Sequence, residues 1–209
     1  RVEGGGQLDS LMFRSLANGM VDLTFGTGGV ARLDVKGPSN DEVRQLAVDT
    51  DGGIVCFGPV TAGNSGADRS LVRFRPNGTL DPQFGTAGRV ELNYQGIETP
   101  LAMALQSDGK IVVCGTASLH NGNYAVTVHR YLRSGVSDLR FGRNGSVTIF
   151  QQPGCCAAGM AIATAPGGKI VVAGRRYNSA NGSDDGFVAR LTSTGLLDRT
   201  FGGRGIVYV

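Results

Sequence analysis

The sequence has few of the residues on which metal centres, disulfide frameworks and membrane spans depend. Of its 209 residues, four are cysteine, two are histidine and none is tryptophan. Two histidines exclude a multi-histidine metal centre within the chain, and the four cysteines lack the spacing of a zinc site or a disulfide scaffold. No apolar run approaches the roughly 20 residues that a spanning helix needs. The sequence therefore predicts no membrane span.

Charge is also sparse. The formal net charge is +3, charged residues make up 18% of the chain, and no run of basic residues is present. A protein that tracks a nucleic-acid backbone needs a basic patch or stripe, so we expect no nucleic-acid binding. The motifs G-x-S-x-G and H-E-x-x-H are absent as well, and no glycine-rich phosphate loop leads into a helix. Catalytic residues are therefore not predicted.

Glycine, by contrast, is abundant. The chain has 34 glycines, far above the usual share of about 7%. Many stand in Asp-Gly, Asn-Gly and Gly-Gly pairs between short apolar runs, which is typical of an all-β chain with many tight turns.

A segment of the form x-Asp-x-x-Phe-Gly, with Leu, Val or Ser at its first position, recurs four times without gaps, with a period of about 58 residues. An arginine stands eight residues before each repeated aspartate. We interpret these residues as scaffold, with the arginine and aspartate paired across a turn and the phenylalanine packed between sheets. The structural repeat consists of Arg14, Asp22, Phe25, Arg73, Asp81, Phe84, Arg130, Asp138, Phe141, Arg190, Asp198 and Phe201.

Each period contains four short β-rich runs, here named a to d. In the second period they are 46–50, 54–58, 70–75 and 89–94. A four-stranded antiparallel sheet cannot bury both faces alone, and copies that pack face to face around an axis form a β-propeller. The predicted fold is all-β, a single propeller portion of about three and a half blades. It comprises a half blade with strands c and d over 1–35 and full blades over 36–95, 96–150 and 151–209.

The runs Asp108-Gly109-Lys110-Ile111-Val112-Val113-Cys114-Gly115, Phe187-Val188-Ala189-Arg190 and Leu197-Asp198-Arg199-Thr200-Phe201-Gly202 resemble the Delta-60 repeat β-propeller proteins of bacteria. The chain is more distantly similar to NHL-type propellers. The resemblance covers nearly the whole chain. It implies the propeller fold and a secreted, cell-surface or periplasmic location, but no assigned chemistry.

The half blade at the start would expose an apolar sheet edge, which proteins avoid because bare edges aggregate. The chain also begins with Arg1 instead of Met. We expect an N-terminal partner polypeptide or cleaved segment to supply the missing strands a and b. The alternative is that an earlier part of the same chain supplies them.

The b–c and d–a loops vary between copies and share one rim of a propeller, so we expect binding there. Cys155 and Cys156 lead into an innermost strand. They could form a vicinal disulfide, or they could pack at the start of the strand as two buried thiols. A polar set in the b–c loops could bind a sugar or a hard cation such as calcium, or consist of ordinary solvated turn residues. Its members are Asn181, Asp184, Asp185, Asn64, Asp68, His120, Asn121 and Asn123.

Three functions remain open at this point. The first is a secreted or surface binding module that recognises a protein or glycan through the b–c and d–a loop rim. The second is part of a propeller enzyme, a hydrolase, lyase or oxidoreductase, whose active funnel is completed by residues outside this chain. The third is a structural component of an extracellular assembly.

Overall fold

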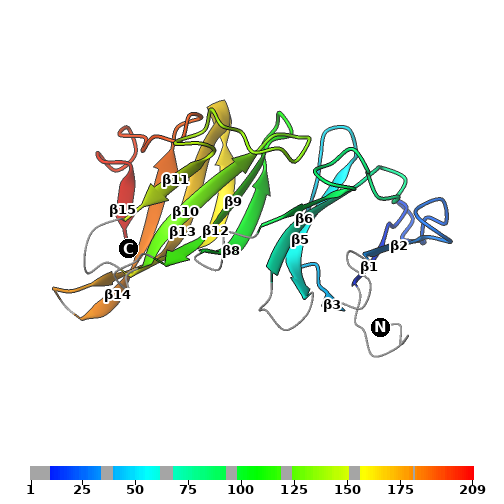
Figure 1. Cartoon of the computed structure of the whole chain (residues 1–209), viewed down its shortest axis with the longest axis horizontal. Coiled ribbons are helices and arrows are strands. Elements are labelled where there is room, and N and C mark those ends of the chain that lie inside the picture. Colours follow the sequence, from blue (N-terminus) through cyan, green and yellow to red (C-terminus); the bar gives the residue numbers. More distant parts are fainter. Residues whose placement is uncertain are drawn as a thin grey trace. The chain divides into compact units, whose positions relative to one another are not determined.

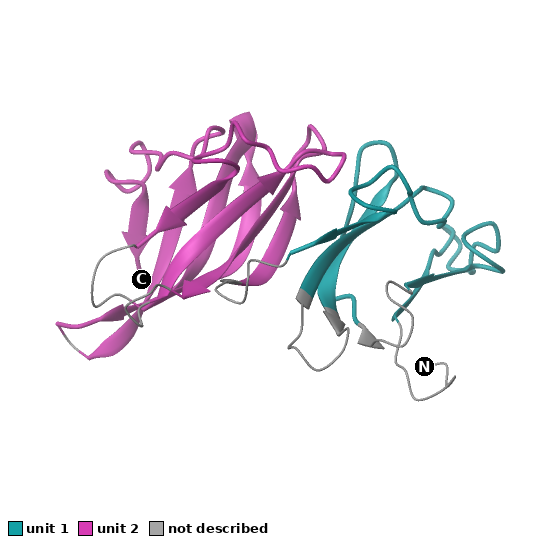
Figure 2. Cartoon of the chain, viewed as in Figure 1, with its two compact units in different colours: residues 1–92 teal, residues 93–209 magenta. Residues whose placement is uncertain are grey.

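The computed structural model describes residues 10–33, 40–61, 68–92, 98–118, 124–150, 156–180 and 182–209. These residues form antiparallel strands and one 3₁₀ turn, η1 (Pro166–Gly168) (Figure 1). None of the described helices is long and apolar enough to cross a membrane. The chain divides into two compact units, residues 1–92 and 93–209 (Figure 2). The predicted all-β fold of propeller blades is confirmed, whereas the assignment of all four parts to a single domain stays a prediction.

The first unit holds the half blade and one full blade. The half blade is the two-stranded sheet of β1 (Ser10–Phe13) and β2 (Val30–Leu33), which are strands c and d. In the full blade the innermost strand is divided into β3 (Asn40–Asp41) and β4 (Gln45–Val48), both paired with the same neighbour. The remaining strands follow in sheet order: β5 (Ile54–Thr61), β6 (Asp68–Phe74) and β7 (Arg89–Glu91).

The second unit holds two four-stranded blades, each with its strands in chain order across the sheet. One blade is formed by β8 (Glu98–Leu105), β9 (Ile111–Ser118), β10 (Tyr124–Tyr131) and β11 (Ser146–Ile149). The other is formed by β12 (Ala157–Ala165), β13 (Lys169–Asn178), β14 (Ser183–Leu191) and β15 (Ile206–Tyr208). Several of these strands have eight to ten residues, more than the five or six of the runs predicted in the second period.

The blades bury their apolar faces against each other. In the second unit one core cluster joins Val112, Val126 and Phe141 of the β8–β11 sheet to Ile170 and Phe187 of the β12–β15 sheet. β-branched and aromatic side chains on facing sheets fill such a core well. In the first unit, a second cluster joins the half blade to the sheet containing β5 and β6. Within each unit, neighbouring repeats therefore pack sheet on sheet, as a propeller requires.

The repeated arginine and aspartate form an ion pair in all four copies. The closest N–O distances are 2.7 Å for Arg14–Asp22, 2.9 Å for Arg130–Asp138 and 2.8 Å for Arg190–Asp198. In three copies the same guanidinium also lies over the repeated phenylalanine ring, 4.4 Å from the centroid in the case of Arg130 and Phe141. The pair joins strand c to the c–d turn, which fixes the turn that presents the phenylalanine.

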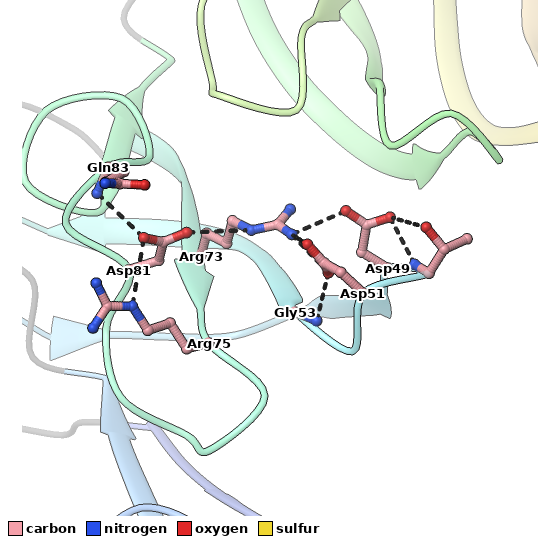
Figure 3. A network of polar contacts seen from close by, with 8 residues as sticks. Asp49, Asp51, Gly53, Arg73, Arg75, Asp81 and Gln83 are labelled. Atoms are coloured by element: carbon pink, nitrogen blue, oxygen red, sulfur yellow. Dashed lines mark hydrogen bonds and ion pairs between the residues drawn. The ribbon is translucent and has the colours of Figure 1, made fainter.

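The second copy departs from this pattern. Figure 3 shows Arg73 between Asp81 on one side and Asp49 and Asp51 on the other. Its Nη2 atom lies 3.0 Å from Asp49 and 2.8 Å from Asp51, while the Nε–Asp81 distance lengthens to 3.5 Å. Both aspartates belong to the a–b hairpin. One buried arginine therefore links the two turns at this end of the blade.

Each full blade has an irregularity in its innermost strand. The register shifts between Pro100 and Ala102 in β8 and between Gly159 and Ala161 in β12, and β3 and β4 are separated at the matching place. A β-bulge of this kind leaves one residue unpaired and re-aims its side chain. The unpaired residues here are Leu101 and Met160.

A glycine in the neighbouring strand accommodates each bulge. A Cβ atom added to Gly115 would lie 2.1 Å from the carbonyl oxygen of Thr99, and one added to Gly174 would lie 1.9 Å from that of Ala158. Gly58 has the same relation to Glu42, at 1.8 Å. The sequence pattern relates the high glycine content to tight turns. These three serve instead the close approach of two strands.

Candidate functional site

A cavity of about 380 Å³ lies between the two blades of the second unit, where strands meet the b–c and d–a loops; we call it the rim pocket. Its volume falls within the range of about 300–1,000 Å³ that small-ligand sites occupy. The two innermost strands, β8 and β12, and the adjacent ends of β9, β10, β13 and β14 contribute to its wall. The lining residues are Leu101, Thr116, Tyr124, Cys156, Ala157, Ala158, Met160, Arg175 and Asp184.

The apolar part of the wall is produced by the two bulges. Leu101 and Met160 are the unpaired residues of β8 and β12, and both line the pocket. The Met160 side chain is 57% exposed and that of Tyr124 is 46% exposed. Exposed apolar side chains that lie together on a surface, unlike single ones, are typical of interaction sites.

The polar part of the wall is an ion pair. Arg175 Nη1 donates to Asp184 Oδ2 at 2.9 Å, from strands β13 and β14 that pair with each other. The two side chains are 63% and 42% exposed. Exposed pairs of this kind contribute little to stability. The pair therefore offers a donor and an acceptor to a ligand at little structural cost.

Cys156 lies at the entry to β12. It is exposed, and its backbone forms a parallel bridge with Tyr124 of the preceding blade. Its carbonyl oxygen accepts a hydrogen bond of 2.8 Å from the amide of Tyr177. The neighbouring blade and β13 thus both hold its backbone. Cys155 lies outside the described residues, so the vicinal disulfide stays a prediction.

The other two described cysteines differ from Cys156. Cys56 and Cys114 are buried, and burial raises the pKa of each thiol to about 12. Cys114 Sγ donates to the carbonyl oxygen of Gly159 at 3.7 Å. Both thiols pack as small apolar groups within the blades, as a buried cysteine commonly does.

Of the polar set predicted from sequence, the structure places Asp184 in the pocket and Asp185 away from it. Neighbouring residues of a strand point to opposite faces, and Asp185 accepts a hydrogen bond of 2.7 Å from Asn178 instead. The side chain of Asp68, at the start of β6, is not described. Outside the described residues lie Asn181, Asn64, His120, Asn121, Asn123 and Cys155.

Sequence reasoning missed most of the pocket. The sequence pattern assigns no role to Leu101, Tyr124, Met160 or Arg175, which line the pocket. The signal available in the sequence was indirect: the glycine that ends each "VVCG" or "VVAG" strand marks a bulge in the strand beside it. Among the described residues, no group of three or more His, Cys, Asp or Glu side chains is arranged to hold a metal ion.

The family comparison matches the same repeats. The model described as "Domain of unknown function (DUF5122) beta-propeller" matches residues 50–84, 106–141 and 166–201, which together make up half of the chain. Each match runs from an a–b hairpin to the repeated phenylalanine of the c–d turn. No curated protein matches the chain. By its three matched repeats, the chain belongs to the DUF5122 beta-propeller family.

Proposed function

We propose that the protein is a binding module that receives an apolar side chain of a protein partner in the rim pocket. The observation that carries this proposal is that Leu101 and Met160, two bulge residues from neighbouring blades, line the same cavity of about 380 Å³. Rigid sheets position both residues. A preformed apolar pocket with a few polar groups is the usual form of a recognition site.

The chemistry of the wall defines the partner. Tyr124 and Met160 offer an aromatic ring and a flexible thioether, which adapt to an apolar side chain. Arg175 and Asp184, at 2.9 Å from each other, can exchange that hydrogen bond for contacts with a peptide amide or carboxylate. A segment with one aromatic or aliphatic anchor beside a polar group fits this arrangement best.

A displayed library of random peptides, selected against the whole chain, tests the proposal. Met160→Glu places a charge in the pocket and should weaken the selected peptides at least about tenfold, a loss of about 1.4 kcal/mol. Met20→Glu is the matched control, because Met20 is 63% exposed on a turn of the other unit. Peptides that bind both variants as tightly as the wild type would place recognition elsewhere.

We also propose that a further polypeptide segment completes the half blade. Among the described residues the sheet of β1 and β2 has two strands, whereas the other blades have strands on both sides of strand c. An added strand would pair with the open edge of β1 by β-augmentation. Intact mass spectrometry of the protein purified from its native source tests this, since a single 21.7 kDa species without a companion polypeptide would contradict it.

The location outside the cytoplasm, which the resemblance to the Delta-60 repeat propellers implies, is part of the same proposal. Fractionation of the native cells with an antibody against the chain tests it. Recovery of the protein with cytoplasmic markers would be the contrary result.

A further inference from the structure

Neighbouring copies of the repeat are joined by a contact that occurs once within each unit. In the first unit Arg14 Nη1 donates to the carbonyl oxygen of Pro76 at 2.7 Å, and the amide of Gly26 donates to that of Asn77 at 2.7 Å. In the second unit the matching bonds run from Arg130 to Ser193 at 2.6 Å and from Gly142 to Thr194 at 2.9 Å. The contact is therefore a property of the repeat.

Each contact has two sides. We call the arginine, phenylalanine and glycine of one copy the donor group; in the first unit these are Arg14, Phe25 and Gly26. The acceptor turn is a segment of three residues in the next copy, which supplies the two carbonyl oxygens and a glycine. In the first unit the acceptor turn is 76–78. In the second unit the acceptor turn is 193–195. The donor group supplies two N–H donors and a ring, and the acceptor turn supplies two oxygens and a flat surface.

The acceptor turn requires glycine for two reasons, its backbone conformation and the space beside it. Gly78 has φ +82 and Gly195 has φ +92, in the left-handed region that favours glycine. A Cβ atom on Gly78 would lie 2.9 Å from Phe25 Cε2, and one on Gly195 would lie 3.0 Å from Phe141 Cε2. Both glycines are buried. The phenylalanine ring of one copy therefore packs directly on the glycine of the next.

The fourth copy has an assembled donor group with no acceptor turn over it in the described part of the chain. Arg190 pairs with Asp198 at 2.8 Å and lies 4.8 Å from the ring centroid of Phe201, as in the other copies. Phe25 and Phe141 are 1% and 0% exposed, whereas Phe201 is only partly buried.

The first copy has the complementary feature, an acceptor turn without a donor group on it. Residues 17–19 have the sequence Ala-Asn-Gly, and Gly19 has φ +83, like Gly78. The amide of Gly19 donates to the carbonyl oxygen of Leu16 at 2.9 Å, which matches the bond from Gly78 to Arg75. Nothing lies within 4 Å of the Cβ position of Gly19, and the residue is exposed.

We infer that the donor group formed by Arg190, Phe201 and Gly202 binds the acceptor turn 17–19 of a second copy of this chain. Arg190 Nη1 and the Gly202 amide would donate to the carbonyls of Ala17 and Asn18, and the Phe201 ring would lie on Gly19. The partner is a second copy because the same chain carries both halves of an interface that it already forms twice. Such a head-to-tail contact is heterologous, so copies can add in series.

This surface differs from the rim pocket and from the open edge of β1, so its test is separate from theirs. Sedimentation velocity of the wild-type chain across a range of concentrations should show association. Gly19→Asn should abolish it, because asparagine tolerates positive φ but places its side chain against the incoming ring. Gly28→Asn is the matched control: Gly28 also has positive φ and open space, and the third copy has Asn144 at the same position of the turn.

Complementation gives the decisive readout. Phe201→Ala removes the donor ring but keeps the acceptor turn, whereas Gly19→Asn keeps the donor group but blocks the acceptor turn. Each variant alone should sediment as a single chain, and an equimolar mixture should form a species of two chains and no larger. The inference is overturned by a wild-type chain that stays single at every concentration. Association unaffected by Gly19→Asn, or a mixture no heavier than its parts, would overturn it equally.

Discussion

Arg73 Nη2 lies 3.0 Å from Asp49 Oδ2, and the two side chains are only 5% and 0% exposed. The same arginine reaches Asp51 and Asp81, so one cation serves three carboxylates from two turns (Figure 3). Removal of one partner from a buried pair leaves a charge without compensation, and the loss is larger than the pair itself contributes.

Arg73→Leu should therefore lower the free energy of unfolding by about 3–5 kcal/mol. Arg75→Leu is the control, because Arg75 is 49% exposed and lies 3.8 Å from Asp81, and its loss should be below about 1 kcal/mol. Urea denaturation of both variants measures the difference. Adding Asp49→Leu to Arg73→Leu should restore part of the stability; equal losses for the two arginine variants would contradict this account.

Gly115 tests the explanation of the bulges. Gly115→Ala would place a methyl group 2.1 Å from the Thr99 carbonyl oxygen, so β8 has to move. Overpacking of this kind costs about 1–3 kcal/mol. Gly186→Ala is the matched strand control, since its added Cβ would meet only Val209 at an ordinary 3.6 Å. Thermal unfolding should show a lower Tm for the first variant and little change for the second.

The repeat explains why so much of the fold could be predicted. A period of about 58 residues, with an Arg–Asp pair and a Phe in each copy, indicates blade order, strand order and the c–d turn. The bulges were not predictable in the same way, because they depend on how closely two backbones approach. The rim pocket depends in turn on the bulges, and its wall combines residues from two blades. Of the residues that line the pocket, only Asp184 and Cys156 were predicted as candidate site residues, because they depart from the repeated pattern.

The pH dependence of stability should reflect Asp198. Hydrogen bonds from Lys169 and then Thr200 hold the pKa of this carboxyl well below its ordinary value of 3.8, and Arg190 adds to the effect. In the unfolded chain the group binds a proton near pH 3.8, whereas in the folded chain it does so only at lower pH. The stabilisation is therefore complete above that pH and is lost as the pH falls through the lower folded value.

Asp198→Asn should flatten the decline of stability below about pH 4, because the variant has no carboxyl to titrate. Thr200→Val should give an intermediate slope. It removes the hydrogen bond of 2.7 Å to Asp198 Oδ1 and the bond of 3.0 Å that Arg190 donates to the Thr200 hydroxyl, but it keeps the Lys169–Asp198 ion pair. Denaturant midpoints measured at several pH values in the acid range provide the comparison. Parallel curves for the wild type and Asp198→Asn would show that this carboxyl does not contribute.

Cys156 should react with thiol reagents much faster than Cys56 and Cys114 do. Cys56 and Cys114 are buried with pKa values of about 12, so almost no thiolate is present at neutral pH. Cys156 is exposed and lines the rim pocket. In a Cys155→Ser variant under reducing conditions, a maleimide should therefore label Cys156 rapidly, while Cys56 and Cys114 should react only after unfolding. Peptide mapping by mass spectrometry identifies the labelled residue. Rapid native labelling of Cys114 would show that the blade interface opens, and it would contradict the packing of β8, β9 and β12 on which the pocket depends.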